Sequence, residues 1–275
     1  MPIDLRPEDT TSKEATDAGA PDDFSDSPVA TRHGLPPASA VRLARKAGLL
    51  YLAVAVLGGF AQFVRVKVYA PSDAAATAAN IVANATLVRL SVVADLIQAM
   101  VWLVLAVTLH RLLAHAGRST ARAMVVFVAV SAAIASLNMV HQLGAVLVAT
   151  DSSYITAFGA DGSQGLVLLL MDLQHYGYLI AQLTWLWLFA LGLLGLRSGL
   201  FPRWLSVLLM IGTICYVADS LTRFLAPTFA DTSATVFLLP EIVCEVALLA
   251  YLLIKGVRTP RVAAPTPGAA HTQLA

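Results

Sequence analysis

The chain has 275 residues, of which 58% are hydrophobic and only 13% are charged, and its formal net charge is +1. A soluble globular domain is nearer to half apolar and a quarter charged, so this composition excludes an ordinary soluble domain and favours an integral membrane protein. The sequence contains no phosphate-binding glycine loop, nucleophile elbow or nucleic-acid motif. Cys215 and Cys244 both fall inside apolar runs and do not suggest a disulfide framework or a zinc site.

Residues 1–40 differ in composition from the rest of the chain. They are rich in acidic residues and in Ser, Thr, Pro and Gly, and such a segment cannot bury enough apolar surface to offset its chain entropy. We therefore expect a disordered tail over 1–40 and a second, Pro-rich disordered tail over 258–275. Residues 41–257 are expected to form one membrane domain.

The membrane domain contains six apolar runs of about 20 residues or more, each long enough to cross a hydrocarbon core of roughly 30 Å. We see no strand-like alternation, so the expected fold class is all-α, a six-helix transmembrane bundle. The fourth run is too long for a straight crossing, so either it tilts or its first turns lie outside the core. The expected spans are Ala47–Val66, Thr86–Thr108, Ala123–Val148, Leu166–Leu196, Trp204–Leu225 and Ala234–Ile254.

The distribution of charge indicates how the bundle is oriented. If the N-terminus lies in the cytoplasm, all but four of the 18 Lys and Arg residues lie on the cytoplasmic side, as the positive-inside rule requires. The four exceptions are Arg65, Lys67, Arg89 and Arg223. Beyond the first 40 residues, no Asp or Glu falls on the cytoplasmic side. We therefore expect both termini to be cytoplasmic.

Ionisable side chains occur within the spans, mostly in the outer half. Such groups are costly in lipid and should face the bundle interior, pair with one another or line a wet cavity. Several are three or four residues apart and therefore share one helix face. A polar pocket open to the outer face is the resulting hypothesis, and its candidate residues are Arg89, Asp95, Asn138, His141, Asp172, His175, Asp219, Arg223, Glu241 and Glu245.

The alternative is an internal network without a ligand. In that case Asp219 and Arg223 form an ion pair, and Arg65 and Arg89 extend to the membrane interface. Pro240 lies inside the last span, where it should kink the helix and free a backbone carbonyl close to Glu241. A helix that begins at Pro240 is the other option, but it leaves a short crossing.

His141 and His175 lie on adjacent spans at similar depth, so they could hold a haem iron or, with carboxylates, a divalent metal. No HExxH or CxxC spacing supports this hypothesis, and we expect no cofactor and no metal. Membrane lipid is an expected partner, a small molecule or ion is the candidate ligand, no nucleic acid is expected, and a homo-oligomer stays open. Gly58, Gly59, Gly192 and Gly195 predict close helix packing.

Several short segments occur in a characteristic order. They are Ala47–Leu52, Pro71–Ile81, Arg89–Ser91, Ala94–Leu96, His175–Tyr178, Ser198–Arg203, Gly212 with Tyr216, Glu241 with Glu245, and Ile254–Gly256. In this order and spacing the chain resembles the bacterial membrane family called domain of unknown function 4386, over about residues 40–257. The resemblance implies a six-helix protein of the bacterial cytoplasmic membrane and transfers no catalytic residue.

Three functional classes follow from these observations. The first is a protein that binds or moves a small ligand or ion through the polar pocket. The second is a structural or partner-binding membrane protein with packed polar pairs, and the third is an intramembrane metal or haem enzyme. We rank them in that order.

Overall fold

Long apolar helices dominate the structure, a computed structural model that describes residues 35–258 except for the side chains of Pro37, Asp231, Thr232 and Ala234. All of these residues belong to the unit Gly34–Ala275. The helices are α1 (Pro37–Val68), α2 (Ala74–Ala83), α3 (Ala85–Leu113), α4 (Arg118–Thr150), α5 (Ser152–Leu183), α6 (Trp187–Ser198), α7 (Arg203–Leu225) and α8 (Pro227–Ile254), with a short 3-10 helix η1 (Ala114–Ala116) before α4.

Residues 35–258 contain no strand, and they provide six helical segments long and apolar enough to cross a membrane. The prediction of an all-α, six-helix bundle is therefore confirmed. α1 begins at Pro37 rather than at Ala47, so the last residues of the segment predicted as a tail are helical. Residues 1–34 and 259–275, the rest of the predicted tails, lie outside the described part of the chain.

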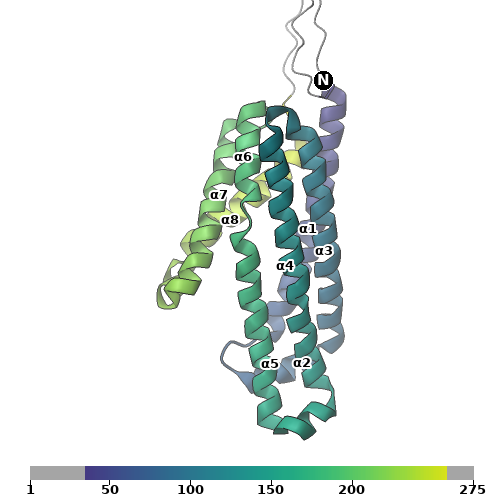
Figure 1. The fold of residues 1–275 in the computed structure, drawn as a ribbon, viewed down its shortest axis with the longest axis vertical. Helices are drawn as coiled ribbons and strands as arrows, with labels where there is room; N and C mark the ends of the chain where they lie inside the picture. Colours follow the sequence, from purple (N-terminus) through teal and green to yellow (C-terminus); the bar gives the residue numbers. More distant parts are fainter. Residues whose placement is uncertain (1–34, 259–275) are drawn as a thin grey trace, which may run out of the picture. The chain divides into compact units, whose positions relative to one another are not determined.

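The fourth predicted span is not one helix but two, α5 and α6, which are separated by Thr184–Leu186 (Figure 1). No Pro or Gly interrupts the chain there. The hydroxyl of Thr184 instead donates to the carbonyl of Ala181 at 2.6 Å and lies 2.5 Å from the hydroxyl of Ser131 on α4. The break is therefore stabilised by contact with a neighbouring helix, which the local sequence does not reveal.

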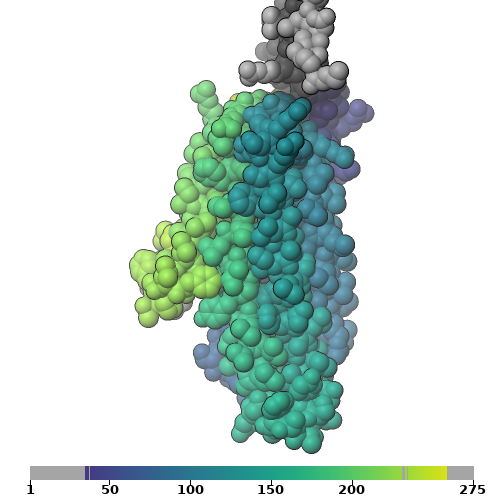
Figure 2. All heavy atoms as spheres, viewed as in Figure 1, coloured from purple at the N-terminus to yellow at the C-terminus, as the bar shows by residue number. Residues whose placement is uncertain are grey.

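The six spans form a closed ring. α1 packs against α3, α3 against α4, α4 against both α5 and α6, α6 against α7, α7 against α8, and α8 back against α1. Side chains fill the gaps that separate the ribbons, as the space-filling view shows (Figure 2). Each span therefore has one side that faces the interior of the ring and one that faces outward.

Apolar side chains cover the outward sides. On α1, for example, Leu49, Val56, Phe63 and Val66 are all more than 60% exposed, which suits contact with lipid rather than water. The inward sides hold the buried core. α8 runs through Pro240 as one helix, so the alternative in which the helix begins at that proline is wrong.

Close packing at glycines is confirmed at three of the four predicted positions. A Cβ at Gly192 would lie 2.6 Å from the carbonyl oxygen of Ser206, and a Cβ at Gly195 would lie 2.7 Å from the hydroxyl of the same residue. Gly58 abuts Gln98 in the same way. Gly59 has no heavy atom within 4 Å of the Cβ position, so the prediction is wrong there.

Candidate functional site

Basic residues gather at one end of the ring, which we call the basic end. The start of α1, the connection from α3 to α4, the connection from α6 to α7 and the end of α8 meet here. The Arg258 N–H donates to the Leu200 carbonyl at 2.9 Å, Arg197 donates to Thr120 at 3.5 Å, and a Cβ at Gly256 would lie 3.4 Å from the Val41 side chain of α1. The basic residues of this end within 35–258 are Arg42, Arg45, Lys46, Arg111, Arg118, Arg122, Arg197, Arg203, Lys255 and Arg258. The candidate residues lie toward the other end, which we call the opposite end, and we call the two halves of the bundle the basic half and the polar half.

Arg65 of α1 and Asp95 of α3 form a buried ion pair in that half. Their closest nitrogen and oxygen atoms are 2.5 Å apart, and each side chain is 11% exposed. The Arg65 guanidinium also donates from Nε to Gln62 at 3.1 Å. The expectation that Arg65 extends to the membrane interface is therefore wrong, because a carboxylate on the neighbouring helix binds it inside the bundle.

A second contact joins α1 and α5 nearer the opposite end. The hydroxyl of Tyr69 donates to Asp172 Oδ1 at 2.5 Å, and the Tyr69 ring stacks on His175 with 6.3 Å between ring centroids. Tyr69 follows the last residue of the first span. Burial raises the pKa of Tyr69 above its ordinary value, and the hydrogen bond to Asp172 acts in the same direction. Tyr69 is therefore held as a hydrogen-bond donor to Asp172.

Three carboxyl groups and one guanidinium lie on the neighbouring helices α7 and α8, and we call Asp219, Arg223, Glu241 and Glu245 the carboxylate cluster. Arg223 Nε donates to Asp219 Oδ2 at 2.9 Å, which confirms the predicted ion pair. The hydroxyl of Tyr216 donates to Glu245 Oε1 at 2.9 Å. Glu241 is only 4% exposed and interacts electrostatically with the other three members.

Two carboxylate oxygens in this cluster stay unsatisfied. Asp219 Oδ1 and Glu241 Oε1 are buried and have no hydrogen-bond partner among residues 35–258. Burying an ionised carboxylate without a full set of partners is costly, and the cost is relieved by a proton or a cation. The cluster can therefore take up positive charge.

Six aromatic rings pack against one another inside the bundle, and we call them the aromatic cluster. They come from α1, α3, α5, α7, the α5–α6 break and α6, and they are Tyr51, Trp102, Tyr178, Trp185, Trp187 and Tyr216. Neighbouring rings pack edge to face, with centroids from 4.7 Å apart for Trp185–Tyr216 to 6.2 Å apart for Tyr178–Trp185. This geometry is the favourable one for ring quadrupoles.

Tyr178 connects the parts of the polar half. It interacts electrostatically with Arg65 of α1, with Asp95 of α3 and with Glu241 and Glu245 of α8. We call the polar side chains of α1, α3, α5, α7 and α8 that are linked in this way, or through the hydrogen bond from Tyr216 to Glu245, the polar region. The aromatic cluster adjoins this region through Tyr178 and Tyr216.

Asn138, His141 and Arg89 do not join this region. Asn138 donates to the backbone carbonyl of Gln174 on α5 at 2.7 Å, and its Oδ1 lies 3.0 Å from His141 Nδ1. These contacts hold α4 against α5 where Gly177 leaves room for the Asn138 side chain. Arg89 is exposed on α3.

Residues 35–258 contain no group of three or more His, Cys, Asp or Glu side chains that could hold a metal ion. Two hollows are lined mainly by apolar side chains, one of about 440 Å³ between α4 and α6 and one of about 400 Å³ between α2, α4 and α5. Neither is lined by a candidate residue.

Sequence reasoning missed the tyrosines. Tyr69, Tyr178 and Tyr216 each contact or interact with a candidate carboxyl group. Helical spacing could have indicated two of them, because Tyr178 is three residues from His175 and Tyr216 is three residues from Asp219, so each pair shares a face. Tyr69 has no such signal.

No curated protein matches the chain, and no solved structure does. Residues 46–256 match the model of one protein family, whose description is "Domain of unknown function (DUF4386)". The match covers most of the six-span bundle and confirms the resemblance described above. This six-span chain therefore belongs to the DUF4386 family.

Proposed function

We propose that this protein binds protons in the carboxylate cluster and moves them across the membrane. The observation that carries the proposal is the pair of buried, unpartnered oxygens, Asp219 Oδ1 and Glu241 Oε1. Chains of Asp, Glu and His inside membrane proteins are typical of proton relays. A proton on either carboxyl group would remove a buried charge and supply the missing hydrogen-bond donor.

A line of exchangeable groups leads from the opposite end toward this cluster. Asp172 accepts the hydrogen bond of Tyr69, and Tyr69 stacks on His175. His175 interacts electrostatically with Asp172, Asp219 and Arg223. Carboxyl, phenol and imidazole groups can all give and accept a proton, so this line supports a route into the bundle.

The aromatic cluster supports the idea of a closed inner gate. Trp185 lies in the α5–α6 break and packs on Tyr216, whose hydroxyl binds Glu245. A change in the protonation of Glu245 would therefore act on a ring that contacts the break. In many membrane transporters, discontinuous helices form the substrate and ion sites near the middle of the bilayer.

For orientation, we propose that the basic end faces the cytoplasm and the opposite end the outside of a bacterial cell membrane. The excess of Lys and Arg at the basic end supports this assignment through the positive-inside rule. The polar region then lies toward the outer face, and both termini are cytoplasmic.

Packed polar pairs support a second candidate, a structural or partner-binding protein. The Arg65–Asp95 pair, the hydrogen bond from Asn138 to the Gln174 carbonyl at 2.7 Å and the hydrogen bond from Gln142 to Ser91 at 2.8 Å each join neighbouring helices without a ligand. On this alternative the polar groups contribute to stability alone.

The test measures proton binding and proton flow in the same variants. Purified full-length protein in nanodiscs is studied by infrared difference spectroscopy between acidic and alkaline pH, and Glu241→Gln should remove a carboxyl C=O band. The protein is also reconstituted in vesicles that contain a pH-sensitive dye, and a potassium diffusion potential drives protons inward. Glu241→Gln should slow the acidification by at least tenfold.

Asp161→Asn is the matched control, because Asp161 is an exposed carboxylate on α5. It should leave the acidification rate and the infrared band of Glu241 unchanged. Wild-type vesicles that acidify no faster than protein-free vesicles would overturn proton movement. A spectrum that Glu241→Gln does not alter would overturn the site and favour the structural alternative.

A further inference from the structure

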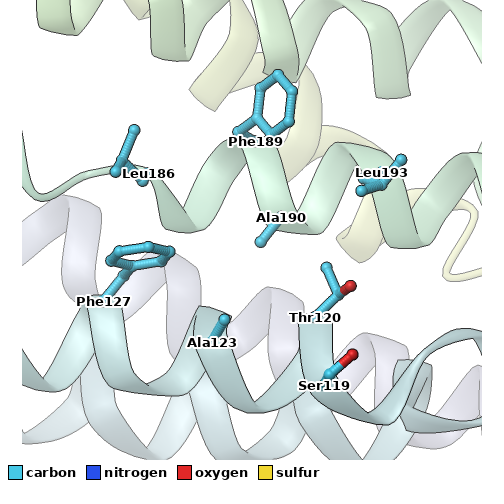
Figure 3. A pocket seen from close by; sticks show the side chains of 8 residues that line it. All are labelled: Ser119, Thr120, Ala123, Phe127, Leu186, Phe189, Ala190 and Leu193. Atoms are coloured by element: carbon cyan, nitrogen blue, oxygen red, sulfur yellow. The ribbon is translucent and has the colours of Figure 1, made fainter.

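The hollow between α4 and α6, which we call the α4–α6 groove, lies apart from the proposed proton site. Its volume is about 440 Å³. Eight residues line it, namely Ser119, Thr120, Ala123 and Phe127 from α4, Phe189, Ala190 and Leu193 from α6, and Leu186 from the α5–α6 break (Figure 3).

The lining changes in character along the groove. Phe127 and Leu186 lie together at one end, and Ser119 and Thr120 lie at the other (Figure 3). Phe127 is seven residues from Thr120, which at a rise of about 1.5 Å per residue corresponds to roughly 10 Å of helix. The groove is thus apolar over most of its length and polar at one end. A phospholipid has the same arrangement, with apolar acyl chains and a polar headgroup.

The polar end of the groove carries basic side chains and lies at the basic end of the bundle. Arg197 donates from Nη1 to the hydroxyl of Thr120 at 3.5 Å. Arg118 and Arg122 occupy the first turns of α4 beside Ser119, and all three arginines are exposed. The sequence has no Asp or Glu between Asp95 and Asp151 or between Asp172 and Asp219, so no acidic residue of α4 or α6 offsets this charge.

The apolar side of the groove is open to the surroundings. Leu186 is 37% exposed and Phe189 is 38% exposed, although both are large apolar side chains. In a bundle that crosses a membrane, such a surface is in contact with acyl chains rather than with water. The arginines then lie where the chain of a bound lipid meets its headgroup.

We propose that the α4–α6 groove binds one anionic diacyl phospholipid, with an acyl chain along Phe127, Leu186 and Phe189 and its phosphate at Arg118, Arg122 and Arg197. Arginine suits this role because its planar guanidinium binds phosphate oxygens in pairs. Basic pockets between membrane helices are known to select anionic headgroups. The inference does not depend on the proton site or on which side of the membrane the basic end faces.

Native mass spectrometry of the full-length protein tests this proposal. Phosphatidylglycerol and phosphatidylcholine with the same acyl chains are added in turn. The wild type should retain one phosphatidylglycerol molecule more tightly than phosphatidylcholine. Arg122→Gln and Arg197→Gln should each weaken the binding of phosphatidylglycerol by about fivefold, which corresponds to roughly 1 kcal/mol for each basic residue.

Matched variants distinguish a specific lipid-binding site from nonspecific electrostatic attraction. Arg197→Lys should keep the preference for phosphatidylglycerol, and Arg89→Gln should leave it unchanged, because Arg89 is an exposed arginine far along the sequence from the groove. Ala123→Leu fills the groove from α4 and should weaken both lipids. Circular dichroism of each variant reports whether the bundle has folded.

Three outcomes would overturn the proposal. Equal binding of the two lipids by the wild type is the first. The second is an effect of Arg89→Gln as large as that of Arg197→Gln. The third is a homodimer that Ala123→Leu dissociates, because the groove would then be occupied by a second copy of the chain rather than by lipid.

Discussion

In the described part of the chain, aspartate caps occur at helix starts of the opposite end and not at those of the basic end. At the opposite end, the carboxylates of Asp73 and Asp151 accept hydrogen bonds from the first turns of α2 and α5, whereas α3 and α8 start there without a side-chain cap. α1, α4 and α7 start at the basic end after Pro36, Gly117 and Pro202, without a side-chain cap and without an acidic residue in the first turn.

This difference shows that helix stability and membrane orientation place different requirements on the sequence. A helix N-terminus favours negative charge, so acidic residues would stabilise the first turns of α1, α4 and α7. Their absence from the basic end therefore runs against helix stability. We attribute it to the proposed membrane orientation, in which positive charge marks one side. The interior follows the same division, with apolar and aromatic packing in the basic half and buried charge in the polar half.

The largest expected effect comes from breaking buried charge in the polar half. Asp95→Leu leaves the Arg65 guanidinium buried without its carboxylate, and we expect the variant to lose about 3–5 kcal/mol of stability. Unfolding in mixed micelles by increasing amounts of sodium dodecyl sulfate measures this loss. The double variant Arg65→Met/Asp95→Leu should recover most of it, because both charges are then removed. An unchanged midpoint for Asp95→Leu would contradict the buried ion pair.

A smaller effect is expected from backbone packing in the basic half. A Cβ at Gly192 would lie 2.6 Å from the Ser206 carbonyl oxygen, which cannot move without shifting α7. Gly192→Ala should therefore cost about 1–3 kcal/mol in the same unfolding assay.

Gly59→Ala is the control for this effect, since no heavy atom lies within 4 Å of its Cβ position. It should stabilise the protein by about 0.5–1 kcal/mol, because alanine loses less chain entropy than glycine in a helix. The two substitutions are chemically identical, so opposite signs would isolate packing as the cause. A stabilising effect of Gly192→Ala as well would show that α6 and α7 are not in close contact.

The sequence predicts the parts of this fold that depend on composition and period. Six apolar runs of sufficient length give the six spans, and the i, i+4 spacing of Asp219 and Arg223 gives their ion pair. Burial of the candidate carboxyl groups follows from the cost of exposing charge to lipid. For the candidate site, the sequence predicts which of its residues share a helix face.

Contacts between distant segments could not be predicted in this way. Arg65 pairs with Asp95 thirty positions away, and Tyr69 reaches Asp172 across 103 positions. The α5–α6 break depends on Ser131 of α4 and on the rings around Trp185, not on a helix-breaking residue. Each feature is set by which helices become neighbours in the ring, and hydropathy does not contain that information.

The smallest expected effect concerns the carboxylate at the start of α5. Asp151 Oδ1 accepts a hydrogen bond from the Ser153 N–H at 2.9 Å, and this interaction lowers the pKa of Asp151 below its ordinary value. A carboxyl group with a lowered pKa in the folded state stabilises it fully above the ordinary value of about 3.9. The contribution is lost as the pH falls through the lowered pKa.

Amide hydrogen exchange across the first turn of α5 should therefore accelerate, relative to its intrinsic rate, as the pH falls below about 4. Asp151→Asn should remove this pH dependence while keeping the turn protected, because asparagine also caps helices but does not titrate. The start of α4, where Gly117 provides no side-chain cap, should show no such dependence in either protein. The same acceleration at both helix starts would mean that acid opens the bundle as a whole. The Asp151 cap would then not be the cause of the faster exchange.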